Sequence, residues 1–368
     1  MLHFVILLLL FLLIVYIANP KALTRNGNTS IYRYLFVALI LALLSALKAS
    51  TIGNDSPEYI RIFETCSDDE FGTTRYEIGY IYYNKLLNII SSNPQILFII
   101  TSAFIFLCVA RFIWKYSQMP WFSMMLFFLN GTFAFFMSAL RQSMALSILL
   151  FAYEALINKK YLLFISICIL ASFFHLSALL FLVCLPLTFV KLNKISISVL
   201  IIVSFFSILL FESLLETALS YVTAYQRYVD GVYFEGDTRA ASILQLILAI
   251  IFLLVGFHSF GNKKTQDNIN SKMVVMFFVA VYLYVLCLKV NLIDRFAIYF
   301  SFFTIIYIPN AINGFSTYGK KRLLINGLIL FYSAYIMVAL VYRPNWNTIY
   351  PYKFFWEEKV RVDYIDRG

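Results

Sequence analysis

The chain has 368 residues, of which 62% are hydrophobic and only 13% are charged. This composition excludes a soluble globular protein, because the apolar residues come in blocks of about 20, the length at which a helix crosses a bilayer. The formal net charge of +10 does not indicate nucleic-acid binding, since the Lys and Arg residues lie in short loops between the apolar blocks.

We predict an all-α polytopic integral membrane protein with roughly 11–12 transmembrane helices, some of them short or broken. Residues 1–368 are expected to form a single polytopic membrane domain. The first apolar run lacks a basic region and a cleavage site, so we expect a retained span. The predicted spans are 2–18, 31–50, 94–114, 119–137, 140–157, a divided segment at 161–174 and 176–190, 196–212, 240–260, 272–291, 295–312 and 323–342.

Basic residues orient these spans, because cytoplasmic loops carry an excess of Lys and Arg. Clusters such as Lys159-Lys160 and Lys263-Lys264 all follow an outside-to-inside crossing if the N-terminus is outside. This pattern requires the apolar stretch 161–190 to form two short halves that meet near His175. Each half has about 14 residues, too few to cross the hydrocarbon core squarely, and discontinuous helices of this kind commonly frame a polar site.

Three segments are predicted on the outer side of the membrane. Residues 51–93 form an acidic loop, in which residues 76–91 have the spacing of an amphipathic helix at the membrane interface. The second outer loop covers residues 213–239, and the C-terminal tail covers residues 343–368. Within the first loop, Ser56-Pro57-Glu58 indicates a helix start, with the serine as its cap.

Two polar residues stand within or beside apolar stretches, where a charge is costly unless it has a partner or a task. Arg141 lies in a short outer turn, so it either reaches the lipid headgroups or offers a fork of donors to a phosphate. Gln142 adds further donors beside it. His175 is either a satisfied core residue or a functional group.

Other polar residues of the outer segments are further candidates. Asp55 and Tyr59 are spaced i,i+4, so they share a helix face, and the carboxylate either acts on a hydroxyl group or only caps the helix. Asp294-Arg295 opens a span at the outer face. The remaining candidates for ligand contact are Arg75, Glu77, Tyr80, Arg239 and Tyr299.

Motifs of several other functional classes are missing from the sequence. It contains no P-loop, no Rossmann glycine pattern, no H-E-x-x-H and no G-x-S-x-G. The five cysteines have no paired spacing, so neither a disulfide framework nor a zinc site is expected. We therefore predict no metal and no cofactor.

Five short motifs follow one another between residues 50 and 300. They are Gly53-Asn54-Asp55 with Tyr59, Glu77-Ile78-Gly79-Tyr80, Arg141-Gln142 with Ala145, Ala171 with His175-Leu176-Ser177-Ala178, and Asp294-Arg295 with Tyr299. Their order and membrane placement resemble the EpsG family of Wzy-type polysaccharide polymerases. That family often has an arginine or a similar residue directly before the aspartate, where this chain has Asn54.

The resemblance implies a multi-pass glycosyltransferase of the bacterial cytoplasmic (inner) membrane, active on the periplasmic or extracellular face. It would polymerise undecaprenyl-pyrophosphate-linked oligosaccharide repeat units into O-antigen, capsule or exopolysaccharide. The implied partners are the lipid-linked glycan donor and acceptor, membrane lipid, and a chain-length regulator and a flippase of the same pathway, with no nucleic acid.

The resemblance also assigns roles to the candidate residues. His175, Asp55 and Arg141 would be catalytic. Histidine commonly exchanges protons near neutral pH, which favours His175 as the base, but Asp55 competes for that role and the residues leave the choice open. Arg141 and Arg295 would stabilise the departing pyrophosphate. The predicted substrate-binding residues are Arg295, Gln142, Tyr59, Arg75, Glu77, Tyr80, Arg239, Asp294 and Tyr299.

Two other functions fit the same sequence features. One is a lipid-linked oligosaccharide flippase or transporter, whose loss would leave repeat units on the cytoplasmic side. The other is a related membrane glycan ligase or acyltransferase, which would be recognised by the product that is missing.

Overall fold

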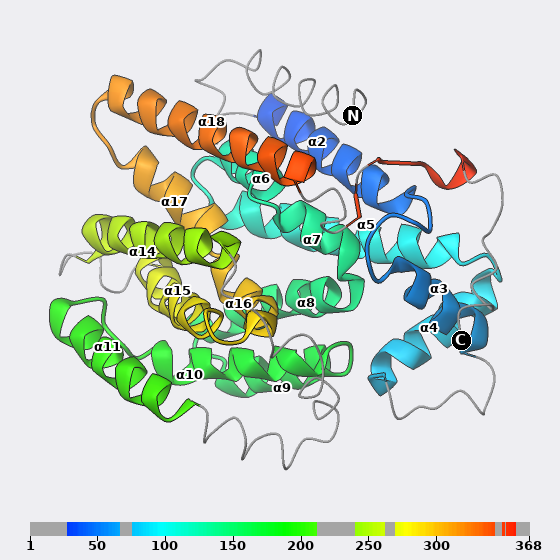
Figure 1. Ribbon diagram of the computed structural model, residues 1–368, viewed down its shortest axis with the longest axis horizontal. Helices are drawn as coiled ribbons and strands as arrows, with labels where there is room; N and C mark the ends of the chain where they lie inside the picture. Colours follow the sequence, from blue (N-terminus) through cyan, green and yellow to red (C-terminus); the bar gives the residue numbers. More distant parts are fainter. Residues whose placement is uncertain are drawn as a thin grey trace. The chain divides into compact units, whose positions relative to one another are not determined.

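The computed structural model describes residues 28–66, 76–211, 240–261, 269–342, 348–349 and 351–357. Within these residues the regular structure is helical, which confirms the predicted all-α class (Figure 1). The elements are α2 (Asn28–Ala46), α3 (Ser56–Thr65), α4 (Ile78–Ile90), α5 (Gln95–Tyr116), α6 (Pro120–Leu129), α7 (Thr132–Ser138), α8 (Leu140–Ile157), α9 (Tyr161–Ser172), η2 (Leu176–Val183), α10 (Cys184–Leu187), α11 (Lys194–Leu209), α14 (Ala240–Phe260), α15 (Ile269–Leu286), η4 (Asn291–Ile293), α16 (Asp294–Ser301), α17 (Thr304–Asn313), α18 (Tyr318–Tyr342) and η5 (Phe355–Glu357).

Several of these helices are long and apolar enough to cross a membrane, so the chain is a multi-pass membrane protein. Five described helices meet this criterion, namely α5, α8, α14, α15 and most of α18, and the bent pairs α6–α7 and α16–α17 raise the number to seven. This number is lower than the predicted 11–12. Four further described helices are apolar but shorter, and the predicted span 2–18 lies outside the described residues.

Two spans that were predicted to be continuous are divided. Helices α6 and α7 are bent by 60° at their junction, and α16 and α17 by 41°. At the first junction, the side chain of Asn130 accepts a hydrogen bond from the backbone N–H of Thr132 at 3.0 Å. This bond satisfies one of the free N–H groups at the start of α7, so the second helix begins in a new direction.

The predicted division of residues 161–190 is confirmed. Helix α9 ends at Ser172, and the 3-10 helix η2 begins at Leu176. The break therefore covers residues 173–175 and includes His175. Helix α9 and the combined segment Leu176–Leu187 are both too short to cross the bilayer perpendicular to its plane.

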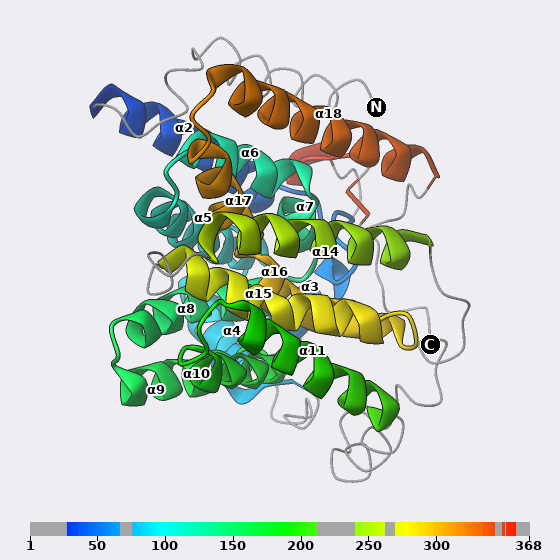
Figure 2. The ribbon, with the colours of Figure 1, turned by 90° about the vertical axis from the view of Figure 1, so that its left-hand side faces the viewer.

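The chain forms two compact units. The first contains the described residues within 1–150, 170–176 and 319–368, and the second contains those within 151–169 and 177–318. In the first unit α5 packs against α2 and α6, and α3 packs against α4. In the second unit α15 packs between α14 and α16, and Figures 1 and 2 both show α14 and α15 side by side.

The outer loop contains the two predicted helices. Helix α3 starts at Ser56, and its N-cap residue is Asp55, so the predicted serine cap is wrong. The side chain of Asp55 makes no capping hydrogen bond. The serine hydroxyl instead donates to the carbonyl oxygen of Ile52 at 2.5 Å. Helix α4 buries one face and exposes apolar side chains on the other, such as Tyr82 and Ile89. It is therefore amphipathic, while its position at the membrane interface stays a prediction.

Gly79, in the first turn of α4, lets this helix start directly against the backbone at Phe173. The backbone N–H of Tyr80 donates to the carbonyl oxygen of Phe173 at 3.1 Å. A Cβ atom at position 79 would lie 2.7 Å from the Cβ atom of Phe173 and 2.8 Å from its carbonyl oxygen. The missing side chain thus determines how closely α4 approaches the break after α9.

We expect Gly79→Ala to lower the midpoint of thermal unfolding of the detergent-solubilised protein, because overpacking against a backbone costs about 1–3 kcal/mol. The matched control is Gly327→Ala in α18, where nothing lies within 4 Å of the added methyl group. It should leave the midpoint unchanged or raise it, since alanine is the better helix former. Equal midpoints for the two variants would contradict the proposed close approach.

Candidate functional site

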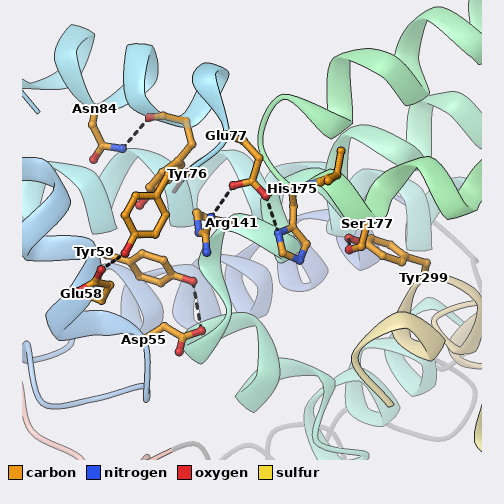
Figure 3. Close-up of polar contacts among 12 residues, drawn as sticks. Asp55, Glu58, Tyr59, Tyr76, Glu77, Asn84, Arg141, His175, Ser177 and Tyr299 are labelled. Atoms are coloured by element: carbon orange, nitrogen blue, oxygen red, sulfur yellow. Dashed lines mark hydrogen bonds and ion pairs between the residues drawn. The ribbon is translucent and has the colours of Figure 1, made fainter. Parts of the chain in front are cut away.

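A polar cluster in the first unit joins the start of α4, the start of α8 and the break after α9 (Figure 3). Its centre is the carboxylate of Glu77, the residue directly before α4. One carboxylate oxygen, Oε2, accepts from Nη1 of Arg141 at 2.5 Å. The other, Oε1, accepts from the backbone N–H of Leu176 at 3.0 Å and lies 3.2 Å from Nδ1 of His175. One acid therefore holds donors from two separate parts of the chain.

These contacts keep Glu77 ionised. Burial alone would raise the pKa of this carboxyl group. The hydrogen bond with His175, the charges of Arg141 and His175, and the N–H of Leu176 outweigh burial and lower the pKa to about 2. Near neutral pH the group is a carboxylate, which accepts hydrogen bonds but cannot donate them.

The ionised Glu77 determines the tautomer of His175. Because a carboxylate has no hydrogen to donate, Nδ1 of His175 must carry the hydrogen in their contact. In a neutral imidazole the other ring nitrogen, Nε2, is then the acceptor. The side chain of His175 is 23% exposed, so the ring that carries Nε2 is not fully buried.

The guanidinium group of Arg141 is enclosed by tyrosines. Its Cζ atom lies 5.0 Å from the ring centroid of Tyr76 and 5.7 Å from that of Tyr80, within the range of cation–π interactions. Arg141 also interacts electrostatically with Tyr59. Its Nε atom and the hydroxyl of Tyr80 are buried without a hydrogen-bond partner among the described residues. Since buried polar atoms normally have partners, this cluster has capacity for a further polar group.

Asp55 joins the cluster through Tyr59. The tyrosine hydroxyl donates to Oδ2 of Asp55 at 3.5 Å, which is the outer limit for a hydrogen bond. The two side chains therefore lie on one face of the helix, as their i,i+4 spacing predicts. Burial raises the pKa of Tyr59, and the charge of Asp55 raises it further, so the phenol keeps its proton near neutral pH. A series of contacts thus runs from Asp55 through Tyr59, Arg141 and Glu77 to His175. Figure 3 shows the contact of Asp55 with Tyr59 and those of Glu77 with Arg141 and His175.

The other predicted site residues lie in three places. Gln142 and Tyr80 are buried in the first unit, in α8 and α4. Asp294, Arg295 and Tyr299 belong to α16 of the second unit, where Arg295 is exposed and the hydroxyls of Tyr299 and Ser177 are 2.9 Å apart. Arg75 and Arg239 lie outside the described residues. The expected convergence of Arg295 with Arg141 stays a prediction.

The role of Glu77 as a shared acceptor was missed by the sequence analysis, which assigned it only to ligand contact. The backbone N–H of Leu176 and the ring of Tyr76 were missed as well. A signal for Glu77 was available: an arginine and a histidine within or beside apolar stretches both need an anionic partner, and few acids precede an apolar helix in this chain.

Replacing Glu77 by Gln should lower stability near neutral pH, and this difference should disappear in acid. A carboxyl group whose pKa is lowered on folding stabilises the protein above its unfolded pKa, near 4.5, and this contribution is lost as the pH falls towards 2. The lowering of the pKa of Glu77 on folding corresponds to roughly 3 kcal/mol in the free energy of unfolding.

The measurement is the difference in thermal midpoint between wild type and Glu77→Gln in detergent. We expect a constant difference above about pH 5 that shrinks at lower pH. A difference that is the same at neutral and strongly acidic pH would show that ionisation of Glu77 does not stabilise the fold.

The comparisons with known proteins concern almost the whole chain. A sequence model of the EpsG family matches residues 31–354, a range that includes Asp55, Glu77, Arg141 and His175. Neither the curated proteins nor the solved structures contain a match. The family points to a polysaccharide-polymerase type of function. The match over most of the sequence and the helical, multi-pass fold agree with the resemblance of the motifs, and the chain therefore belongs to the EpsG family.

Proposed function

We propose that this protein is a membrane glycosyltransferase that polymerises lipid-linked oligosaccharide repeat units. The carrier is undecaprenyl pyrophosphate, the product is O-antigen, capsule or exopolysaccharide, and the active face of the bacterial cytoplasmic membrane is periplasmic or extracellular. The observation that carries the proposal is the Glu77 carboxylate, which holds the guanidinium of Arg141 and the imidazole of His175 on its two oxygens. Family membership supports a polysaccharide-polymerase type of reaction.

Activation of the acceptor is assigned to His175. Its Nε2 atom takes the proton from the acceptor hydroxyl as the hydroxyl oxygen attacks the anomeric carbon of the donor. Glu77 then stabilises the imidazolium that forms and keeps Nδ1–H pointing at Oε1. The acid of a Ser-His-Asp triad has the same role, because it orients the base without taking up the proton itself.

Departure of the carrier is assigned to Arg141. The bond between the anomeric carbon and the pyrophosphate oxygen breaks, and its electron pair leaves with the lipid pyrophosphate. A guanidinium has five N–H donors in a fork that suits phosphate oxygens, and Glu77 occupies Nη1. Because Glu77 and the tyrosines hold the group in place, little reorganisation is needed when negative charge develops.

Glu77 is assigned to positioning rather than to sugar contact. Both of its oxygens already accept hydrogen bonds from the protein. Asp55 has a different environment, because the hydrogen bond that it accepts from Tyr59, at 3.5 Å, is at the outer limit for such a bond. It can therefore reach a sugar hydroxyl, and it remains the competing base.

Arg141→Ala should abolish long glycan while the protein is still expressed and inserted. We expect a loss of about 10²–10³-fold in the rate of chain extension, the usual effect of removing one charge-stabilising donor. The assay incubates purified protein with a synthetic lipid-linked repeat unit and resolves the products as a ladder. The matched control is Arg322→Ala, an exposed arginine of α18, which should leave the ladder unchanged.

In cells, the Arg141→Ala variant should display single repeat units on the outer surface. Accumulation on the cytoplasmic side would instead indicate a flippase, and a normal ladder from purified Arg141→Ala would remove this residue from the reaction.

His175→Ala and Asp55→Asn distinguish the two candidate bases. The acid limb of the profile of kcat/KM against pH reports protonation of the base in the free enzyme. We expect His175→Ala to lose about 10²–10⁴-fold in kcat/KM and to lose this limb, whereas Asp55→Asn keeps it. If Asp55→Asn removes the limb and His175→Ala keeps it, the base is Asp55.

A further inference from the structure

Lys48 is a fully buried cation just beyond the end of α2. Its Nζ atom donates to Oγ of Ser56 at 2.7 Å and to the carbonyl oxygen of Met137, and it lies 4.7 Å from the ring centroid of Phe98. An ammonium group has three N–H donors, so two hydrogen bonds and an aromatic face account for all of them.

The burial of Lys48 is unfavourable by itself. Loss of solvation lowers the pKa of Lys48 to about 7, although the charge of Asp55 acts in the opposite direction. An apolar side chain of similar length would avoid this cost. A lysine is useful here only if its hydrogen bonds fix the relative position of two segments that apolar packing would leave variable.

The two hydrogen-bond acceptors of Lys48 belong to separate segments of the site. Ser56 is the first residue of α3 and directly follows Asp55. Met137 lies in α7, which ends at the corner where α8 begins with Leu140 and Arg141. One ammonium group therefore joins the turn that carries Asp55 to the corner that precedes Arg141.

Gly53 shows how closely this turn lies on the corner. Its φ angle is +90°, and a Cβ atom there would lie 2.8 Å from Oγ of Ser56, 2.9 Å from the carbonyl oxygen of Met137 and 3.1 Å from Nζ of Lys48. The next residue, Asn54, donates its backbone N–H to Oγ of Ser138 at 3.0 Å. The turn and the corner are thus in contact on both sides of the ammonium group.

We propose that Lys48 is a positioning residue for glycosyl transfer, which holds the turn of Asp55 at a fixed distance from the corner of Arg141. Tyr59 contacts both of these side chains, so their separation determines whether the series of contacts across the site is complete. Lys48 is completely buried and does not touch substrate. The inference rests on the proposed function, because Asp55 and Arg141 have their roles there.

The test is a double-mutant cycle of Lys48→Met with Asp55→Asn, measured as chain extension by the purified full-length protein. We expect Lys48→Met to lower kcat about tenfold, with KM for the lipid-linked repeat unit within about twofold of wild type. The double variant should be no slower than Asp55→Asn alone, since Lys48 acts through the turn that carries Asp55. A normal kcat for Lys48→Met would overturn the inference. So would a double variant whose loss of activation free energy equals the sum of the losses in the two single variants.

Two further variants keep the test informative if Lys48→Met does not fold. Gly53→Ala leaves the lysine in place but forces the turn away from it, and it should show the same lack of additivity with Asp55→Asn. Lys320→Met removes an exposed lysine of α18 and should have no effect on kcat. Full activity of Gly53→Ala would count against the proposed contact between the turn and the corner.

A spin label on Asn54→Cys separates failure of this inference from failure of the proposed function. Asn54 is exposed, whereas the five native cysteines are buried, so the label should react selectively. The label should be more mobile in the Lys48→Met variant than in the otherwise wild-type protein, because the turn is then no longer held by the ammonium group. If the wild-type protein extends no glycan, the proposed function fails. The spectra still test whether Lys48 holds the turn in place. Unchanged mobility in the Lys48→Met background would overturn the inference even if polymerase activity is present.

Discussion

The shared carboxylate of Glu77 is the interaction on which the candidate site depends. It provides negative charge for Arg141, an acceptor for His175 and an acceptor for the N–H of Leu176. Without it, a largely buried guanidinium would face tyrosine rings without this ion pair, and the imidazole would have no fixed tautomer. The same contact joins three helix ends that are far apart in the sequence, so one side chain determines both the local electrostatics and the arrangement of the backbone.

Broken helices make this contact possible. A continuous helix through residues 161–190 would use the N–H of Leu176 in its own hydrogen-bond ladder, whereas the break at 173–175 leaves that N–H available to Glu77. The start of α4 approaches the same break because Gly79 has no side chain. Unwound backbone at the end of a short helix is a common way to place polar groups within a membrane protein, because neighbouring elements satisfy the free donors.

Local patterns in the sequence were sufficient for part of this arrangement. The i,i+4 spacing of Asp55 and Tyr59 and the short halves around His175 depend on helix geometry and on the thickness of a bilayer, and the structure has both features. The pairing of Glu77 with Arg141 could not be predicted in the same way, because it joins residues 64 positions apart and depends on how α4 and α8 pack. No role was predicted for Lys48, because it was assigned to the span 31–50, although a lysine at the end of an apolar stretch is itself unusual.

The close approach at Gly79 also limits how this part of the chain can vary in length. Successive residues of an α-helix are rotated by about 100° around its axis. Glu77 directly precedes α4 in an extended conformation, so inserting or deleting a residue between it and Gly79 would rotate the start of the helix and move the carboxylate away from the break while the glycine stayed against Phe173. The interval of two residues from Glu77 to Gly79 is thus a geometric requirement of the fold, and only the exposed side chain of Ile78 between them is free to vary.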